Sequence, residues 1–384
     1  KKEKGKAKVK PQLRKKNYKR ENEKKKKKKV SALIMAGILA MTAMSGCTGK
    51  EEAAADDYAI TVGYYNCDHM TAGPVAEAAG IYKELGLNVT TVGNGKVPEA
   101  MAAGQMDAGY IGTRGLTASI PKGAPIAVAA NNHLGGSEYL IVSNEIKDVK
   151  DLVGKKIATN MDDFLWKTDY GPESGLEVDA SKYEIVNMDS SKDAYLALKT
   201  GQIQAFTTCD PWGSLAESEG TGRIVASTQY KEEATGKEYN CCSFSINKNF
   251  AKEHPELAEK LVLAHTKAIE YIYTNPAEAA KIFAKYYNID EEVAMITIYK
   301  KTVGEGRTIT WKVTGEEYKN NLQMYKDQSV METVPSYEEV VDLTYLENCG
   351  ADDFDTFIKE NVDSVFPLGM DYATWKEKAL SINA

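Results

Sequence analysis

The chain has 384 residues, of which 43% are hydrophobic, and a formal net charge of -7. That length is enough for two domains of ordinary size with a large buried core. Residues 1–30 hold 17 of the 48 basic residues and 3 of the 55 acidic residues, so the rest of the chain is strongly acidic. An acidic body repels nucleic acid, which argues against nucleic acid as a partner, and a basic tail on it indicates targeting or a membrane surface.

The N-terminal region has the pattern of an export signal. Six lysines, Lys24–Lys29, precede an uncharged stretch of 17 residues, Val30–Gly46. This stretch is short for a membrane span but suits the apolar region of a signal peptide. It ends at Cys47 in the sequence "MSGC", which resembles the lipobox of bacterial lipoproteins, although Met44 stands where that motif usually has Leu.

The lipobox resemblance implies three segments. Residues 1–46 are the basic leader and lipoprotein signal peptide, and residues 47–57 are the lipidated Cys47 and a polar tether. Acyl chains on Cys47 would anchor the protein to the cell membrane. The alternative is an uncleaved N-terminal anchor, and both interpretations place the body outside the cytoplasm.

From Tyr58 onward, short β-like runs alternate with helical patterns. The predicted elements are, in chain order, a strand at 58–65, a helix at 73–86, a strand at 87–93, a helix at 96–104, a strand at 107–112, a helix at 113–123 and strands at 125–131 and 138–143. Strand–helix alternation of this kind predicts an α/β domain with a mostly parallel sheet.

The pattern restarts near residue 150. The second series comprises a strand at 156–159, a helix at 163–174, a strand at 182–187, a helix at 191–201, a strand at 203–208 and a helix at 211–220. Beyond residue 250 the chain is predicted to be mainly helical, with Pro255 and Pro276 each in the first turn of a helix. Two α/β lobes followed by helices predict a ligand site beyond the carboxyl ends of the strands.

Five segments in this order resemble one known family. They are "GPVAEAAGIYKELGLNV", "AMAAGQMDAGYIG", "DLVGKKIAT", "CDPWGSLAESEG" and "FAKEHPELAEKLVLAHTKAIEYIYTNPAEAAKIFAK". The family is that of ABC-importer solute-binding proteins of the nitrate, sulfonate and taurine type, which includes binders of thiamine-pyrimidine precursors. The resemblance implies a periplasmic-binding-protein type II fold with a ligand cleft between two α/β lobes. Lobe 1 would be residues 58–145 plus 246–384, with the C-terminal helices, and lobe 2 residues 150–240.

The stretch "YYNCDHMTAGP" brings a thiol, a carboxylate and an imidazole together in the sequence. Neighbours in a loop are expected to point apart, and the chain has four histidines and no HxxxH or HExxH motif, so metal binding and catalysis are disfavoured. The position between a strand and a helix favours a ligand loop over a plain connector. Its candidate ligand-binding residues are Tyr65, Asn66, Cys67, Asp68 and His69.

Other loops at equivalent places supply the remaining candidates. In lobe 1 they are Lys96, Thr113, Arg114, Asn132 and His133, and in lobe 2 they are Asn160, Asp162, Asp189, Asp210 and Trp212. The basic residues suit an anion, and the acidic ones an amine on the ligand. The plainer alternatives are surface charges for Lys96 and Arg114, helix N-caps for Asp162 and Asp210, and core packing for Trp212.

The expected function is therefore capture of a small anionic or zwitterionic solute, such as a sulfonate, taurine or nitrate, for delivery to the ABC permease. No cofactor, metal or enzymatic activity is expected, and the protein is expected to be a monomer. Cys241-Cys242 complicates this, because a cysteine-rich stretch at a comparable place marks the pyrimidine-synthase enzymes of the family. A pyrimidine-precursor binder, such an enzyme and a structural or sensory lipoprotein are the alternatives.

Overall fold

A computed structural model describes residues 58–65, 67–135, 138–159, 176, 179–188, 190–227 and 236–382. The predicted signal peptide, Cys47 and tether, and the helix predicted at 163–174, lie outside these residues. Among the described residues, no helix is both long and apolar enough to cross a membrane.

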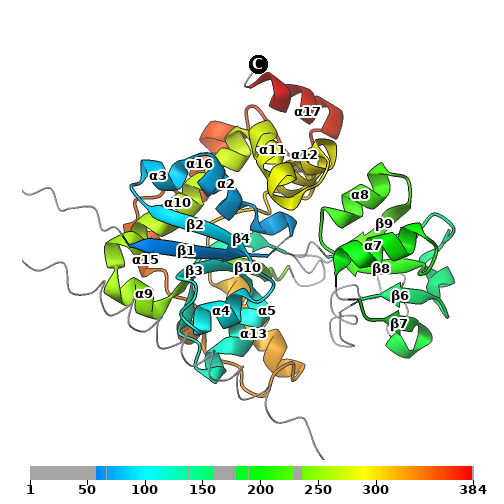
Figure 1. The fold of residues 1–384 in the computed structure, drawn as a ribbon, viewed down its shortest axis with the longest axis horizontal. Coiled ribbons are helices and arrows are strands. Elements are labelled where there is room, and N and C mark those ends of the chain that lie inside the picture. Colours follow the sequence, from blue (N-terminus) through cyan, green and yellow to red (C-terminus); the bar gives the residue numbers. More distant parts are fainter. Residues whose placement is uncertain are drawn as a thin grey trace, which may run out of the picture. The chain divides into compact units, whose positions relative to one another are not determined.

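The first of two sheets has the strand order β2-β1-β3-β10-β4 (Figure 1). Strand β1 pairs in parallel with β2 and β3, whereas β10 lies antiparallel between β3 and β4. The bounds are β1 Ala59–Tyr64, β2 Asn88–Gly93, β3 Ala108–Gly112, β4 Ile126–Leu134 and β10 Asn240–Asn247. The sequence did not predict β10, because it lies far along the chain from the strands that it joins.

The second sheet has the order β7-β6-β8-β5-β9. Strand β6 is parallel to β7 and β8, and β5 is antiparallel to β8 and β9. The bounds are β5 Tyr139–Ser143, β6 Lys156–Ala158, β7 Glu184–Val186, β8 Ala205–Thr208 and β9 Gly222–Ser227. Both sheets are thus mixed. The prediction of mostly parallel sheets is wrong for the strands just before and just after the chain crosses from one sheet to the other, because these strands pair antiparallel.

The lobe boundaries expected from sequence differ from this pairing in two places. Strand β5 falls within 58–145 but pairs in the second sheet, and most of β10 precedes residue 246 but pairs in the first. The boundaries as a whole stay a prediction.

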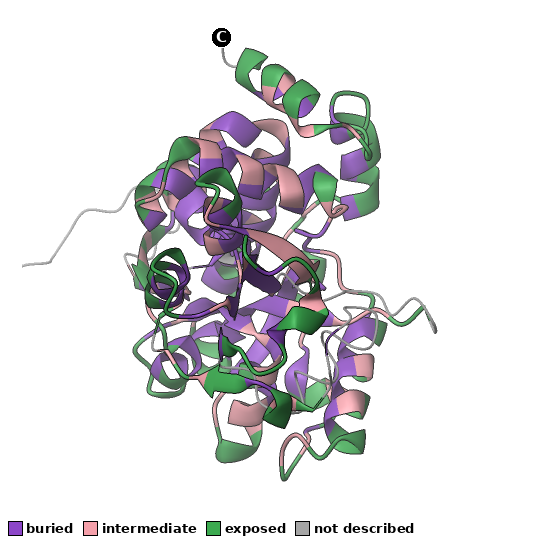
Figure 2. Ribbon diagram, turned by 90° about the vertical axis from the view of Figure 1, so that its right-hand side faces the viewer, coloured by how far each residue is buried: buried purple, intermediate pink, exposed green. Residues whose placement is uncertain are grey.

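Helices cover both faces of the first sheet. One face packs against α2 Ala72–Ala78, α10 Pro255–Thr274, α11 Pro276–Tyr287 and α12 Glu291–Tyr299, in one large apolar core. The other packs against α4 Val97–Ala102, α5 Thr113–Ser119, α13 Glu316–Asp327 and α14 Tyr337–Val340. Figure 1 shows these two groups on opposite sides of β1 and β3, and Figure 2 shows buried residues concentrated along the sheets and the inner helix faces.

The second sheet separates two smaller cores. Alternate residues of β5 enter them: Tyr139 and Ile141 pack with α7 Ser191–Lys199 and α8 Trp212–Ser218, while Leu140 and Val142 face the opposite side. This alternation follows from the two-residue repeat of a strand.

The other described helical segments are short, apart from α17. They are α3 Ile81–Glu84, α9 Lys248–Glu253, α15 Thr344–Asn348, α16 Phe354–Phe357, α17 Tyr372–Ser381, the 3-10 turns η1 Asp68–Met70, η2 Ile120–Lys122, η3 Val149–Leu152 and η5 Ala180–Lys182, and the π-helical turns η6 Lys300–Gly304 and η7 Ile358–Val362. Helices α10 and α11 begin at Pro255 and Pro276 as predicted.

The helix predicted at 73–86 is two helices, because Gly80 between α2 and α3 has φ +80°. This left-handed conformation ends a helix and is open to glycine without steric cost.

Candidate functional site

The loop after β1 meets the loop after β8. The backbone N–H of Asp68 donates to the carbonyl of Asp210 over 3.1 Å. The Sγ atoms of Cys67 and Cys209, the residues before them, lie within 4.8 Å of each other. Two loops at the carboxyl ends of strands in different sheets therefore lie in contact, at the place where open α/β sheets bind ligands.

Six thiol and imidazole side chains gather at this contact, and we call them the thiol–imidazole cluster. The donor atoms of Cys67, Asp68, His69 and Cys209 lie within 4.8 Å of one another, as do those of His69, His133, Cys241 and Cys242. The members of the cluster are Cys67, His69, His133, Cys209, Cys241 and Cys242. The expectation that the side chains of residues 67–69 point apart is wrong, because the tight turn η1 brings them toward donors from β4, β10 and the loop after β8.

Distances within the cluster are short. Nδ1 of His69 lies 3.3 Å from Nδ1 of His133 and 3.4 Å from Sγ of Cys241. Asn132 donates through Nδ2 to Sγ of Cys242 over 3.3 Å, and to the carbonyl of His69. The sheet and η1 are thus joined by side chains that are buried, apart from the half-buried Cys241.

A network of buried charges adjoins the cluster. Nζ of Lys301 lies 3.2 Å from Oδ2 of Asp68, 2.6 Å from Oε2 of Glu305 and 2.9 Å from the hydroxyl of Tyr139. Lys301 and Asp68 are both fully buried. Lys301 belongs to η6, a π-helical turn, and such turns are frequent at functional sites.

Lys300, the other lysine of this turn, reaches the loop after β8. Its Nζ lies 3.4 Å from Oδ2 of Asp210 and donates to Oγ of Ser214 over 2.8 Å. Asp210 also accepts from the N–H and hydroxyl of Ser214, at 2.8 and 2.7 Å. The helix-start role considered for Asp210 is therefore present, together with its contacts to the other sheet's loop.

Burial sets the protonation of several of these groups. It raises the pKa of Asp68 to about 7, although the Lys301 ammonium acts to lower it. It lowers the pKa of His133 well below the usual value. The hydrogen bond from Cys67 lowers the pKa of the Cys209 thiol to about 5.

Several buried polar atoms at this place lack hydrogen-bond partners among the described residues. They are Oδ1 of Asp68, Oδ1 of Asn132 and Nε2 of His133, whereas Oδ2 of Asp68 is in the ion pair with Lys301. Buried polar atoms are almost always paired in folded proteins, so orphaned atoms gathered at one place indicate a missing partner.

The other predicted site residues are spread more widely. Lys96 is exposed before α4, Thr113 is buried and bonded to Asn240, and Arg114 is half-buried in α5. Trp212 is half-buried and packs in the core of the second sheet, 6.1 Å from the ring of Tyr195. Tyr65 is half-buried next to the loop after β1. Asn66, Asn160, Asp162 and Asp189 lie outside the described residues.

Several residues of this site are not among the ligand-binding residues predicted from the sequence, although Cys241-Cys242 was noted there as a possible mark of the enzyme branch. They are Tyr139, Cys209, Cys241, Cys242, Lys300, Lys301 and Glu305. The sequence does contain two signals of these residues, namely the adjacent cysteines and the two lysines that follow the apolar helix α12. Neither signal indicates which residues these side chains contact.

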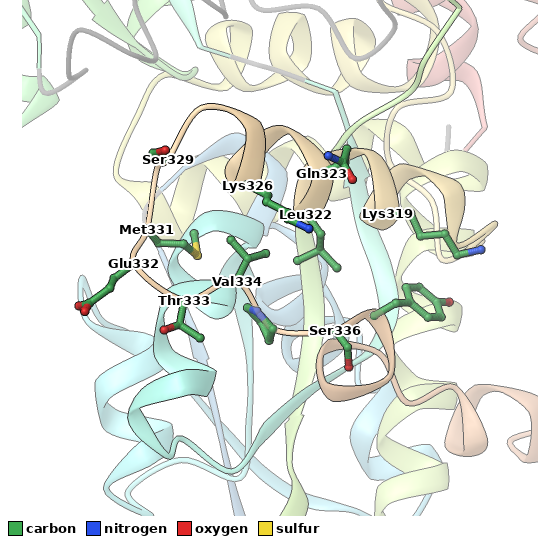
Figure 3. Close-up of a pocket in the computed structure, with 12 residues that line it drawn as sticks. Lys319, Leu322, Gln323, Lys326, Ser329, Met331, Glu332, Thr333, Val334 and Ser336 are labelled. Atoms are coloured by element: carbon green, nitrogen blue, oxygen red, sulfur yellow. The ribbon is translucent and has the colours of Figure 1, made fainter.

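A separate groove of about 660 Å³ lies between α13 and the segment that follows it (Figure 3). Its lining includes Lys319, Leu322, Lys326 and Val334, and none of its lining residues belongs to the thiol–imidazole cluster. The residues that line this groove include no cysteine or histidine, so it lacks the thiols and imidazoles found where the loops after β1 and β8 meet.

The fold defines a class of protein. It matches the nitrate-binding protein NrtA of Synechocystis PCC 6803 with a TM-score of 0.61 at 13% identity, covering 84% of this chain and 98% of that chain. It matches the alkanesulfonate-binding protein SsuA of Xanthomonas axonopodis with a TM-score of 0.58 at 17% identity, covering 74% and 96%. The chain therefore has the periplasmic-binding-protein fold, as predicted.

Sequence comparison gives the family. The NMT1/THI5-like family matches residues 68–279, and the chain belongs to this family. A binding protein of Brucella abortus is 27% identical over 250 residues, 62% of this chain and 75% of that protein. The taurine-binding periplasmic protein of Escherichia coli is 24% identical over 184 residues, 47% and 55% of the two chains.

The same fold also occurs in an enzyme. A point mutant of the desulfurization enzyme DszB, in complex with biphenyl-2-sulfinic acid, matches with a TM-score of 0.57 at 13% identity, covering 76% of this chain and 99% of that chain. The fold by itself thus does not separate binding from catalysis.

Proposed function

We propose that this chain is the extracytoplasmic solute-binding component of an ABC importer, which captures a small anionic or zwitterionic solute and delivers it to the permease. The observation that carries the proposal is the set of orphaned buried atoms of Asp68, Asn132 and His133, at the contact between the loops after β1 and β8. A polar ligand bound there would satisfy them.

The chemistry of these atoms favours a ligand that has both a donor and an acceptor. The Asp68 carboxylate and Oδ1 of Asn132 accept hydrogen bonds, which suits an ammonium group on the ligand. Nε2 of His133, when it carries the imidazole proton, would donate a hydrogen bond to an anionic group. A zwitterion such as taurine presents both kinds of group, and the taurine-binding relative supports this class.

A thermal-shift screen with taurine, alkanesulfonates, nitrate and pyrimidines tests the proposal. A ligand that binds only the native state raises the melting temperature, by an amount equivalent to about 2.7 kcal/mol at a concentration of 100 times Kd. The screen is run with EDTA present, so that metal effects do not contribute. If none of these compounds shifts the melting temperature, the assigned ligand class is wrong.

Comparing taurine with ethanesulfonate tests the ammonium contact. The two share the sulfonate, so stronger binding of taurine isolates the contribution of the amine. Asp68→Asn is expected to reduce the preference for taurine, because the variant removes the negative charge. Equal affinities of the two ligands in calorimetry would exclude the amine contact.

Binding of a thiamine-pyrimidine precursor, or pyrimidine-synthase-like chemistry, is the second candidate. It is favoured by membership of the NMT1/THI5-like family and by Cys241-Cys242 next to His69. A Schiff-base absorbance on incubation with pyridoxal phosphate would support the enzyme, and a shift with pyrimidines alone would support the binder.

The remaining parts of the proposal concern placement. Residues 1–46 would direct export, Cys47 would carry the lipid anchor, and a monomer would present its solute to the permease. Mass spectrometry of the protein from membranes tests the anchor: diacylation of Cys47 supports it, and an intact unmodified N-terminal region contradicts it.

A further inference from the structure

Four side chains of the thiol–imidazole cluster are placed like the ligands of a metal ion. The donor atoms of His69, His133, Cys241 and Cys242 all lie within 4.8 Å of one another. We propose that these four residues form a tetrahedral binding site for a zinc-like divalent cation. This cation site goes beyond the proposed solute-binding function; it shares His133 with the proposed solute site but uses Nδ1 of that residue, whereas the solute is assigned to Nε2.

The measured separations agree with tetrahedral geometry. Zn–N bonds of 2.0–2.1 Å at the tetrahedral angle place two nitrogen atoms about 3.3–3.4 Å apart, and a Zn–S bond of 2.3 Å places sulfur about 3.6 Å from nitrogen. The Nδ1 atoms of His69 and His133 are 3.3 Å apart, and Sγ of Cys241 lies 3.4 Å from Nδ1 of His69. A cation at the centre would need little rearrangement of these atoms.

A β-bulge explains how two adjacent cysteines reach one point. Successive residues of a regular strand point to opposite faces of a sheet. In β10, however, Asn240 pairs with Leu134 and Cys242 pairs with His133, so two steps on β10 oppose one step on β4. Cys241 is the extra residue, and a bulge re-aims its side chain. The same pairing places Cys242 directly opposite His133.

The surroundings hold two of the ligands in place. Nδ2 of Asn132 donates to Sγ of Cys242 over 3.3 Å, as the hydrogen-bonded neighbours of metal-bound thiolates do. The same amide donates to the carbonyl of His69, so that Asn132 ties the turn η1 to the sheet. Cys242, His133 and Asn132 are each fully buried.

The charges of the proposed site also balance. Two thiolates and a divalent cation with two neutral imidazoles have no net charge, so burial of the complete site avoids the large cost of an isolated buried ion. The buried cation Lys301 is already paired with Asp68 and Glu305.

The second group of donors, Cys67, Asp68, His69 and Cys209, is the weaker choice. The Asp68 carboxylate faces the Lys301 ammonium at 3.2 Å, and that ammonium would repel a cation bound to the carboxylate. Cys209 follows β8 of the second sheet, whereas the four proposed ligands come from η1, β4 and β10. Cys209 is therefore a matched control, being a thiol beside His69 but outside the proposed ligand set.

Titration of the full chain with Co²⁺ tests the site directly. The protein is first reduced and stripped of metal, and the titration is done without oxygen and without any solute. We expect one equivalent of Co²⁺ to bind with release of the thiol protons and to give the intense visible absorption of tetrahedral cobalt with a thiolate charge-transfer band; Zn²⁺ should displace it without further proton release. Cys241→Ser and His133→Gln should lose this spectrum, and Cys209→Ser should keep it.

Circular dichroism of each variant separates loss of the site from loss of the fold, and half-exposed Cys241 provides the variant least expected to disturb the core. Asn132→Ala should weaken binding about 10–100-fold without abolishing the spectrum. An octahedral spectrum, absence of binding by the folded reduced protein, or loss of the spectrum in Cys209→Ser with retention in Cys241→Ser would overturn the proposal. The solute screen contains EDTA and the cobalt titration contains no solute. The cation proposal and the solute proposal can therefore fail separately.

Discussion

Lys301 and Asp68 form an ion pair of 3.2 Å between two side chains that are both fully buried. The pair joins the π-helical turn η6 to the turn η1, and it lies beside the orphaned atoms to which we assign ligand binding. Its energetic role can be tested apart from any ligand.

Lys301→Met should destabilise the protein by about 3–5 kcal/mol, because it leaves buried carboxylates without their cation. Urea unfolding at neutral pH measures the loss. The double variant Lys301→Met with Asp68→Asn should recover a substantial part of it, since neither charge then remains alone. Lys319→Met, in the exposed Lys319–Glu316 pair, is the control and should change little. A single variant as stable as the wild type would contradict this role.

His265 should make stability depend on pH. Its Nε2–H donates to the carbonyl of Asn131 over 2.7 Å, and the Tyr110 hydroxyl donates to Nδ1 over 3.2 Å. Burial lowers the pKa of His265 to about 4, from 6.5. Between these values the unfolded chain binds a proton that the native chain does not, so stability is fully present above pH 6.5 and is lost as the pH falls toward 4.

From pH 7 to pH 5 this histidine should cost the native state about 2 kcal/mol. The raised pKa of Asp68 acts in the opposite direction over the same range, because there the native chain binds the extra proton. The measurement is therefore a comparison of urea unfolding between wild type and His265→Gln at both pH values. The variant should lose less stability on acidification; equal losses would rule out the histidine as the cause.

Gly109 in β3 has no room for a side chain. An added Cβ would lie 2.5 Å from Cγ1 of Val97 and 3.2 Å from the carbonyl oxygen of Gly63. Gly109→Ala should therefore destabilise the protein by about 1–3 kcal/mol through overpacking. Gly115→Ala is the matched control in α5, where the Cβ meets only Pro98 at 3.8 Å. Alanine favours a helix over glycine by about 0.5–1 kcal/mol, so thermal unfolding should shift upward for this variant.

Asp210→Ala should destabilise the native state by about 2–3 kcal/mol, because it removes both acceptors for Ser214 and the partner of Lys300. Asp210→Asn keeps one acceptor oxygen and should lose less. Chemical denaturation compares the two. If both variants retain full stability but lose solute binding, Asp210 acts on the ligand and not on the fold.

Parts of this architecture could be predicted from local sequence alone. Strand β1 and the starts of α10 and α11 at proline agree with prediction. These features depend on side-chain periodicity and on the fixed φ of proline, which are properties of consecutive residues. The family resemblance was also confirmed, and it too depends on consecutive residues, in five short segments.

The candidate site depended on contacts that no local pattern contains. Search for HxxxH motifs disfavoured a metal, yet His69 meets His133 from β4 and Cys241 from β10, which is 172 residues away along the chain. The bulge that turns Cys241 toward His69 arises only when β10 pairs with β4.

The sequence by itself thus determined the α/β class and the order of most elements, and it predicted the loops that meet at the candidate site, because periodicity, glycine and proline act over a few residues. Only the tertiary structure decided that β10 enters the first sheet, that Lys301 neutralises Asp68, and that thiols and imidazoles converge. Those outcomes depend on pairing between distant strands and on burial, which fix both the direction of a side chain and the cost of leaving its charge or polar atoms unpaired.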